Sequence, residues 1–227
     1  MRIRVIRGRG IKQLMQIQVM IKKLVFKIIN LPVSLRIRLY PYINRALLWA
    51  KNVRHGTNCK IYNRISIIGN GKISLGENFT MTSGDAINPI SSNLMGCFYT
   101  EPGAEIIIGD NVGMSATRIW IKEKLTIGNN VNVGANVLLI DNDCHQIDYK
   151  MRRHDAQKYF SKEELRDNVI SAPITIEDDV WIGAHSLILK GVTIGARSII
   201  GAGSVVTKSI PSDCIAAGNP CKVIRKL

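Results

Sequence analysis

Aliphatic residues recur at every sixth position in the C-terminal part of the chain. The series is Ile176, Ile182, Ile188, Ile194, Ile200 and Val206. Small or aliphatic partners lie four positions after each of these, at Val180, Ser186, Val192, Ser198, Ser204 and Ile210. Because side chains of a strand alternate between its two faces, an inward aliphatic at every sixth position requires a corner within each hexad. The spacing therefore predicts triangular coils that stack and bury one another's cores.

The same period continues upstream with irregularities. One run is Ile121, Ile127, Val133 and Leu139, with Leu125, Val131 and Val137 as its partners. An earlier run of Pro102, Ile108 and Met114 is one residue out of phase, which predicts a local bulge. Leu75 and Met81 mark the expected first coil. We therefore expect an all-β fold, a parallel β-helix of hexapeptide repeats over residues 61–227.

A step of 37 residues from Leu139 to Ile176 interrupts the period. The sequence inside this step is polar and compatible with a helix from Tyr149 to Asn168. We expect an inserted loop at about residues 141–172 that projects from one coil.

The N-terminal region follows a different pattern. Apolar residues recur at helical spacing over residues 10–30, and Pro32 ends the predicted helix. A second short helix is expected from Asn44 to about Lys51, after Pro41. Residues 1–60 are therefore predicted to form a basic, amphipathic helical extension.

The net charge of +14 belongs to this extension. Residues 1–60 contain 14 Lys and Arg and no acidic residue, whereas from Glu77 onward there are 15 basic and 17 acidic residues. Such asymmetry favours an anionic partner. We rank an anionic membrane surface first and packing on a neighbouring subunit second. Nucleic acid is ranked last, because the first 25 residues lack aromatics and no nucleic-acid-binding motif is present.

The cysteines and the N-terminal lysines bear on the compartment. Five cysteines without a C-x-x-C spacing argue against a disulfide framework or a structural zinc site. Lys12, Lys22, Lys23 and Lys27 interrupt the N-terminal apolar residues, which argues against a signal peptide or a membrane-spanning helix. We expect a cytoplasmic protein, peripheral at the inner face of the plasma membrane.

Four segments together identify a family resemblance: Trp181–Ala184, Lys190–Gly195, Ile200–Lys208 and Ala217–Arg225. They resemble the hexapeptide-repeat, left-handed β-helix acyltransferases. The chain is similar to the galactoside and maltose acetyltransferases and to O-acetyltransferases of bacterial surface polysaccharides. The resemblance implies a left-handed coil, a homotrimer with active sites between subunits, and acetyl-CoA as the co-substrate.

Acetyl transfer to a hydroxyl requires a base, and a histidine suits this role near neutral pH. His145 follows Leu138–Cys144, where a coil breaks into the inserted loop, which resembles the position of the family's catalytic histidine. Either Asp141 or Asp143 is expected to orient its imidazole. The alternative for His145 is a solvated loop histidine beside two capping acids.

The other histidines carry less weight. His185 occupies an outward position in a hexad, His154 lies among charged loop residues, and His55 precedes the repeats. Some zinc carbonic anhydrases resemble this fold, but they gather three histidines from an H-x4-H spacing that is absent here. No metal is therefore expected.

The donor site is predicted from the last coils. Coenzyme A is long and anionic, so it requires a groove, backbone polar groups and cations. The small residues Gly183, Ala184, Gly201 and Ala202 are expected to leave room for it. The resemblance implies that Trp181 packs against the pantetheine or adenine. It also implies contacts from Thr207, Lys208, Lys222 and Arg225 to the nucleotide end, although ordinary surface roles are equally compatible with these four residues.

Together these features predict an acetyl-CoA-dependent O-acetyltransferase acting on a sugar hydroxyl. The expected setting is biosynthesis of a capsule, exopolysaccharide or lipopolysaccharide, with a sugar or glycan as acceptor. Alternatives are an amino-sugar N-acetyltransferase and an antibiotic acetyltransferase. A non-catalytic β-helix scaffold is the rival from a different class.

Overall fold

The computed structural model describes residues 20, 23, 32–158 and 169–227. The chain divides into two compact units, Met1–Leu39 and Tyr40–Leu227, and the second unit holds all the strands that the structure describes. The helix predicted over residues 10–30 lies outside the described residues, apart from Met20 and Lys23, which are helical.

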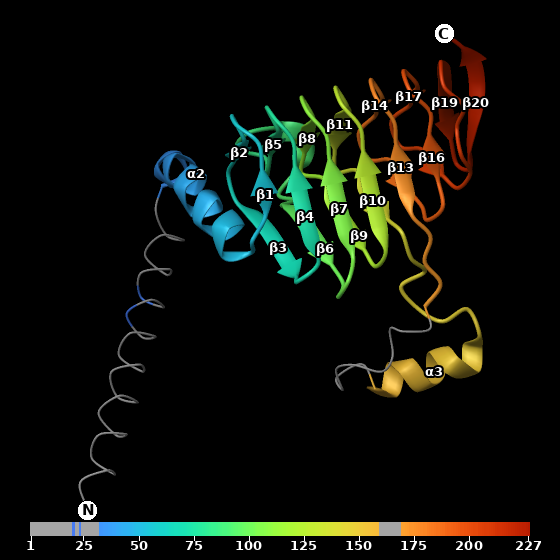
Figure 1. Ribbon diagram of the computed structural model, residues 1–227, viewed down its shortest axis with the longest axis horizontal. Helices are drawn as coiled ribbons and strands as arrows, with labels where there is room; N and C mark the ends of the chain where they lie inside the picture. Colours follow the sequence, from blue (N-terminus) through green and yellow to red (C-terminus); the bar gives the residue numbers. More distant parts are fainter. Residues whose placement is uncertain (1–19, 21–22, 24–31, 159–168) are drawn as a thin grey trace, which may run out of the picture. The chain divides into compact units, whose positions relative to one another are not determined.

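The strands of the second unit form three sheets, in which each strand pairs with the equivalent strand of the neighbouring coil, except in the hairpin at the C-terminal end (Figure 1). Sheet A contains β1 (Arg54–His55), β4 (Lys72–Leu75), β7 (Glu105–Ile108), β10 (Lys124–Ile127), β13 (Ile174–Ile176) and β16 (Thr193–Ile194). Sheet B contains β2 (Lys60–Tyr62), β5 (Thr80–Thr82), β8 (Gly113–Ser115), β11 (Asn132–Ala135), β14 (Trp181–Ile182), β17 (Ile199–Ile200), β19 (Cys214–Gly218) and β20 (Cys221–Lys226). Sheet C contains β3 (Ile65–Gly69), β6 (Gly96–Thr100), β9 (Arg118–Ile121), β12 (Leu138–Ile140), β15 (Leu187–Ile188) and β18 (Val205–Val206).

All strand pairs are parallel except β19 with β20. The predicted fold is confirmed as a left-handed parallel β-helix of hexapeptide repeats. Each coil turns from sheet A to B, from B to C and from C to A. We call the connections the A–B, B–C and C–A corners.

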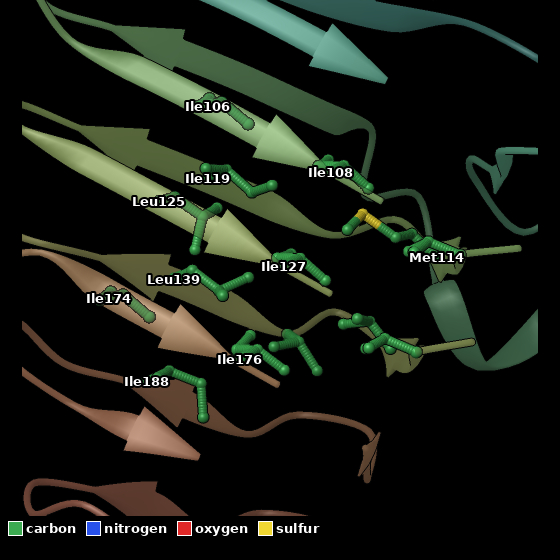
Figure 2. Close-up of a cluster of buried hydrophobic side chains, with 14 of the residues drawn as sticks. Ile106, Ile108, Met114, Ile119, Leu125, Ile127, Leu139, Ile174, Ile176 and Ile188 are labelled. Carbon is green, nitrogen blue, oxygen red and sulfur yellow. The ribbon is translucent and has the colours of Figure 1, made fainter. Parts of the chain in front are cut away.

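The predicted inward residues form the core. Ile176, Ile182, Ile188, Ile194, Ile200 and Val206 are all fully buried. The register of the parallel strands places identical residues of neighbouring coils side by side, for example Ile127 beside Ile176 and Ile176 beside Ile194. Figure 2 shows side chains from successive strands meeting inside the coils. Burying each such side chain contributes about 1.5–3 kcal/mol, so the stack of coils supplies the stability that a single coil lacks.

Three upstream expectations require correction. Pro102 is exposed in the turn between β6 and β7, so it does not belong to the core series, and Ile106 is buried instead. The first coil is β1–β3, with Ile61 and Ile67 buried, rather than the coil at Leu75. The register between β8 and β11 does shift, but the extra residue lies in β11, between Val133 and Ala135, and not between Met114 and Ile121 where the bulge was expected.

The helix before the coils is longer than predicted. Helix α2 spans Val33–Ala50 and continues through Pro41, so its predicted start at Asn44 is wrong. Proline removes one hydrogen bond from a helix interior, but packing of the following turns compensates. Leu48 is buried, and Asn44 Nδ2 donates to the carbonyl oxygens of Ile61 at 3.3 Å and Asn63 at 2.7 Å.

Two segments interrupt the coils. Helix α3 (Tyr149–Lys158) lies between β12 and β13, and the 3-10 helix η1 (Pro89–Ser91) lies between β5 and β6. The longer segment is closed at its base, where Asp143 N donates to Ile170 O at 3.0 Å and Ala172 N donates to Asp141 O at 2.9 Å. Among the described residues, no helix has both the length and the apolar character needed to cross a bilayer.

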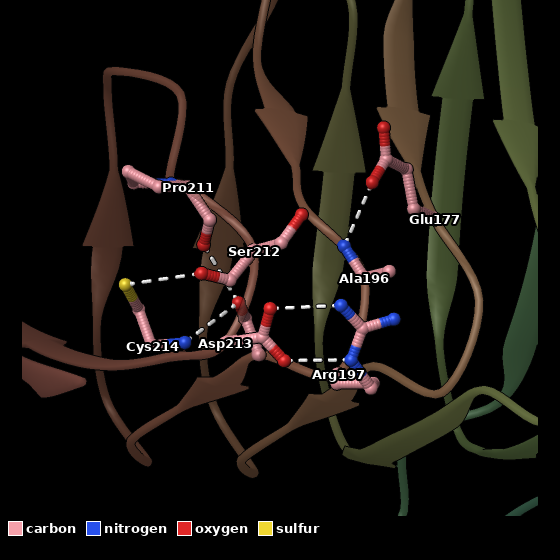
Figure 3. A network of polar contacts seen from close by, with 8 residues as sticks. Glu177, Ala196, Arg197, Pro211, Ser212, Asp213 and Cys214 are labelled. Atoms are coloured by element: carbon pink, nitrogen blue, oxygen red, sulfur yellow. Dashed lines mark hydrogen bonds and ion pairs between the residues drawn. The ribbon is translucent and has the colours of Figure 1, made fainter. Parts of the chain in front are cut away.

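Polar contacts secure the last coils (Figure 3). The Arg197 guanidinium pairs with the Asp213 carboxylate at 2.6 and 2.8 Å. Glu177 accepts a hydrogen bond from Ala196 N at 2.8 Å, and Ser198 Oγ donates to Pro211 O at 2.7 Å. These contacts tie the A–B corners to the turn that precedes β19.

Candidate active site

A groove of about 430 Å³ runs over the outer face of sheet B and the B–C corners. All five residues predicted to form the body of the donor site line it: Trp181, Gly183, Ala184, Gly201 and Ala202. The remaining lining residues are Asn88, Ile90, Ser115, Gly134, Ala135, Ile199 and Ile200. The Trp181 side chain is 54% exposed, so its indole is available to a ligand.

The glycines of the groove are needed by the coil stack itself. A Cβ atom on Gly183 would lie 2.4 Å from Ala202 N, and one on Gly201 would lie 2.8 Å from the Cβ of Ala217. Successive corners therefore approach too closely for a side chain at these positions. Ala202 differs, because it is exposed and faces the groove. Gly183 and Gly201 are therefore required by the close approach of successive coils, whereas Ala202 leaves open space in the groove.

The opposite wall of the groove was not predicted. It comes from the β5–β6 segment, which is anchored when Asn88 Nδ2 donates to Ser115 Oγ at 2.8 Å and Asn136 Nδ2 donates to Ile90 O at 3.1 Å. The available signal was the missing hexad between Met81 and Phe98, where an Asn-Pro pair marks a turn.

The predicted nucleotide contacts lie elsewhere on this chain. Thr207, Lys208, Lys222 and Arg225 are all exposed, and none of them lines the groove. Arg225 Nη1 donates to the backbone oxygen of Lys226 at 3.0 Å. Their predicted role in binding the nucleotide stays a prediction.

His145 lies beyond β12, at the start of the C–A connection of the fourth coil. Its side chain is exposed, and its backbone N donates to Asp143 O at 2.7 Å. Cys144, the preceding residue, has a positive φ of 62°. This tight turn directs the chain out of the coil into the inserted loop.

The Asp141 carboxylate is occupied by backbone hydrogen bonds. It is fully buried, and its carboxylate accepts hydrogen bonds from Lys122 N at 2.7 Å, Glu123 N at 2.7 Å and Lys124 N at 3.0 Å. The carboxylate thus caps the corner of the coil below. The structure does not bring it to the His145 imidazole.

Asp143 has a free acceptor. Its Oδ1 pairs with Lys190 Nζ from the C–A corner of the next coil. Its Oδ2 is buried and has no hydrogen-bond partner in the part of the chain that the structure describes. Of the two candidate acids, Asp143 therefore retains an oxygen that can accept a hydrogen bond from an imidazole.

The neighbouring thiol is not activated. Burial raises the pKa of Cys144 above its ordinary value of 9.0, and the carboxylates of Asp143 and Glu101 raise this pKa further. A thiol is a nucleophile only as its thiolate, so this environment disfavours attack by Cys144 at neutral pH.

The groove and His145 occupy different corners of the same chain. The groove follows the B–C corners, whereas His145 follows sheet C and opens a C–A corner. Sheet C separates the two. Of the other histidines, His185 lies in a B–C corner and is exposed, and the side chain of His154 lies outside the described residues. Within the described ranges, no three His, Cys, Asp or Glu side chains gather into a candidate metal site.

Comparisons with known proteins agree with this fold. Residues 173–208 match the family described as bacterial transferase hexapeptide (six repeats). The galactoside O-acetyltransferase of Escherichia coli K12 is 39% identical over 57% of this chain and 58% of that protein. The corresponding enzyme of Lactococcus lactis is 37% identical over 58% of this chain and 60% of that protein. The chain thus spans about six tenths of the length of these curated relatives.

A solved structure covers more of the chain. The maltose O-acetyltransferase of Clostridium difficile 630 is 26% identical with a TM-score of 0.50, over 91% of this chain and 83% of that one. These matches confirm the family resemblance expected from the sequence.

Proposed function

From its similarity to the hexapeptide-repeat transferases, we propose that this chain is an acetyl-CoA-dependent O-acetyltransferase acting on a sugar hydroxyl. The carrying observation is the groove, because five of the nine residues predicted for the donor site gather there. The galactoside and maltose O-acetyltransferases among its relatives support a sugar as the acceptor.

Acetyl-CoA is the co-substrate in this proposal, and the groove suits its elongated pantetheine arm. In this proposal the apolar side of the pantetheine arm packs on Trp181 and occupies the open space over Ala202. Backbone groups of the corners supply hydrogen bonds along the arm. Lys208, Lys222 and Arg225 are the cations proposed for the nucleotide phosphates.

His145 acts as the general base in this mechanism. Its imidazole takes the proton of the acceptor hydroxyl while the hydroxyl oxygen bonds to the thioester carbonyl carbon. A backbone N–H stabilises the negative charge that develops on the carbonyl oxygen. The carbon–sulfur bond then breaks, and the imidazolium returns the proton to the departing thiolate. Asp143 is the proposed partner of the imidazole.

A second copy of the chain completes the site. Because His145 and the groove lie at different corners, His145 of one subunit meets the groove of its neighbour in the proposed homotrimer. The proposed acceptor is a glycan precursor of capsule, exopolysaccharide or lipopolysaccharide. Residues 1–60 are proposed to hold the enzyme at an anionic membrane surface where such precursors are made.

Release of free thiol from acetyl-CoA, followed with a panel of sugars, tests the catalytic proposal. His145→Ala is expected to lower kcat by about two or more orders of magnitude, as for loss of a general base. His154→Ala, in the inserted loop, is the matched control and should keep its turnover. Unchanged turnover in His145→Ala would remove this residue from the mechanism. Failure of the wild-type chain to bind coenzyme A would favour a non-catalytic scaffold.

Sedimentation with vesicles tests the membrane proposal. The full chain should sediment with phosphatidylglycerol vesicles and not with phosphatidylcholine vesicles. Replacing Lys12, Lys22, Lys23 and Lys27 by Gln should weaken this binding, since each basic residue near an anionic surface contributes about 1 kcal/mol. Equal binding by both chains would contradict the proposal.

A further inference from the structure

A second, larger cavity of about 820 Å³ lies where α2 meets the first coil. One wall is the helix, through Tyr42, Arg45 and Leu48. The other wall is the edge strand β2 with the A–B corner that precedes it, residues 56–62. The cavity shares no residue with the groove on the later coils. Its volume is in the range of small-molecule binding sites, about 300–1,000 Å³.

The cavity has a preformed floor. Leu48 and Ile61 line it and are buried, with exposed fractions of 4% and 6%. Asn44 joins the two walls through its hydrogen bonds to the carbonyl oxygens of Ile61 and Asn63. The helix is therefore fixed on the coil by contacts at the base, while the mouth of the cavity stays open.

The lining is cationic. Arg45 and Lys60 are exposed and line opposite walls, and no carboxylate forms an ion pair with either of them within the described part of the chain. Glu77 is the one acidic residue of the lining, and its Oε2 already accepts hydrogen bonds from the backbone N and the Oγ1 of Thr57. A concave surface with unpaired cations concentrates an anionic ligand.

The neutral part of the lining indicates what accompanies the anion. Tyr42 and Tyr62 line the cavity and are 76% and 39% exposed, so each offers an aromatic face and a phenolic hydroxyl. Arg and Lys side chains bind phosphate oxygens through charge-assisted hydrogen bonds. A phosphate ester with an organic group several atoms long would match both the cationic part and the neutral, aromatic part of the lining.

We propose that this cavity binds a phosphate-bearing ligand, with Arg45 and Lys60 holding the phosphate between α2 and β2. Tyr42, Tyr62 and Leu48 contact the organic part of the ligand. The shared chemistry is a phosphate monoester or diester, supplied either by a membrane lipid headgroup or by a soluble ester. The site does not depend on the proposed acetyl transfer.

Binding measurements on the full chain test the proposal. sn-Glycerol 3-phosphate is titrated by calorimetry, and phosphatidylglycerol vesicles are tested by sedimentation. The double variant Arg45→Gln/Lys60→Gln should bind at least one of these probes about tenfold more weakly or worse, as expected for lost hydrogen bonds to a charged group. The matched control is Lys72→Gln/Arg118→Gln, which removes two exposed cations outside this cavity and leaves the same net charge.

The outcomes separate the two sources. Binding of the soluble ester that is lost only in the cavity variant assigns a soluble ligand, and binding of vesicles alone with the same loss assigns a lipid headgroup. Equal losses in the two double variants would show that net charge alone attracts phosphate, and would overturn the site. Failure of the wild-type chain to bind either probe would also overturn it. Thermal unfolding of both variants verifies that they are folded.

Discussion

At the scale of single residues, Cys144 decides between direct and two-step transfer. Its raised pKa keeps the thiol protonated at neutral pH, so it should not carry an acetyl group. Cys144→Ala is expected to keep kcat within about twofold of the wild type, because no covalent intermediate is required. Rapid-mixing kinetics with acetyl-CoA in the absence of acceptor provides the check. A burst of free thiol that disappears in Cys144→Ala would support the two-step route instead.

Ala202 tests the groove independently of the base. Its side chain is exposed over the groove, so Ala202→Leu should fill the space proposed for pantetheine without disturbing the coil stack. We expect KM for acetyl-CoA to rise by about tenfold or more with a smaller change in kcat, as for lost ground-state binding. Steady-state kinetics measures both constants.

Ala196→Leu is the matched control, because Gly195-Ala196 occupies the A–B corner of the same coil as Gly201-Ala202 in the B–C corner. Ala196 does not line the groove. A similar rise of KM in both variants would indicate a general effect on folding and would count against the groove as the donor site.

The repeat explains which residues of the site were predictable. A strict period assigns each residue to a face or a corner, so it placed Ala184 and Ala202 in corners, whereas the role of Trp181 was implied by the family resemblance. Asn88 and Ser115 were missed, because their wall depends on a segment without a period. A capping role for Asp141 was the alternative considered, but the backbone groups that it caps could not be named, since they depend on which corner of the preceding coil lies beside this residue.

At the scale of structural elements, the turn before β19 carries one exposed ion pair, between Arg197 and Asp213. The hydrogen bond from Arg197 holds the pKa of Asp213 below its ordinary value of 3.8. A carboxyl with a lowered pKa in the folded state stabilises the fold above its unfolded pKa, and this contribution is lost as pH falls through the folded pKa. The stabilisation should therefore be present near pH 6 and absent in strong acid.

Asp213→Asn should lower Tm near pH 6 by about 2 °C or less, because exposed ion pairs stabilise weakly. Near pH 2, the variant and the wild type should unfold at nearly the same temperature. Scanning calorimetry at both pH values measures the difference, and Asp85→Asn, an exposed aspartate outside this turn, is the control. A Tm difference that grows on acidification would contradict the assignment.

Helix α2 shows where local sequence signals fail. Pro41 predicted a helix boundary, yet the helix continues because Asn44 and Leu48 in the following turns pack on the first coil. The loss of one backbone hydrogen bond is smaller than the stabilisation from these tertiary contacts. A single sequence cannot show those contacts, since the first coil was itself assigned too late in the chain.

At the scale of the whole molecule, the six-residue period predicts how the coils of one chain stack but not how separate chains assemble. The coil order fixes His145 and the groove at different corners, on either side of sheet C. The proposed site combines the two from neighbouring chains of the proposed homotrimer, so its assembly is testable through activity alone.

Coexpression of two variant chains, each impaired at low acetyl-CoA, tests this arrangement. A His145→Ala chain retains an intact groove, and an Ala202→Leu chain retains its histidine. If every site combines the histidine of one subunit with the groove of another, random assembly at equal amounts restores about one quarter of the sites. Thiol release at low acetyl-CoA should then reach about one quarter of the wild-type rate. Separately purified variants, mixed without subunit exchange, should show only the mean of their own low rates, because no mixed site can form. The same low rate after coexpression would place base and groove in one chain and would contradict the shared site.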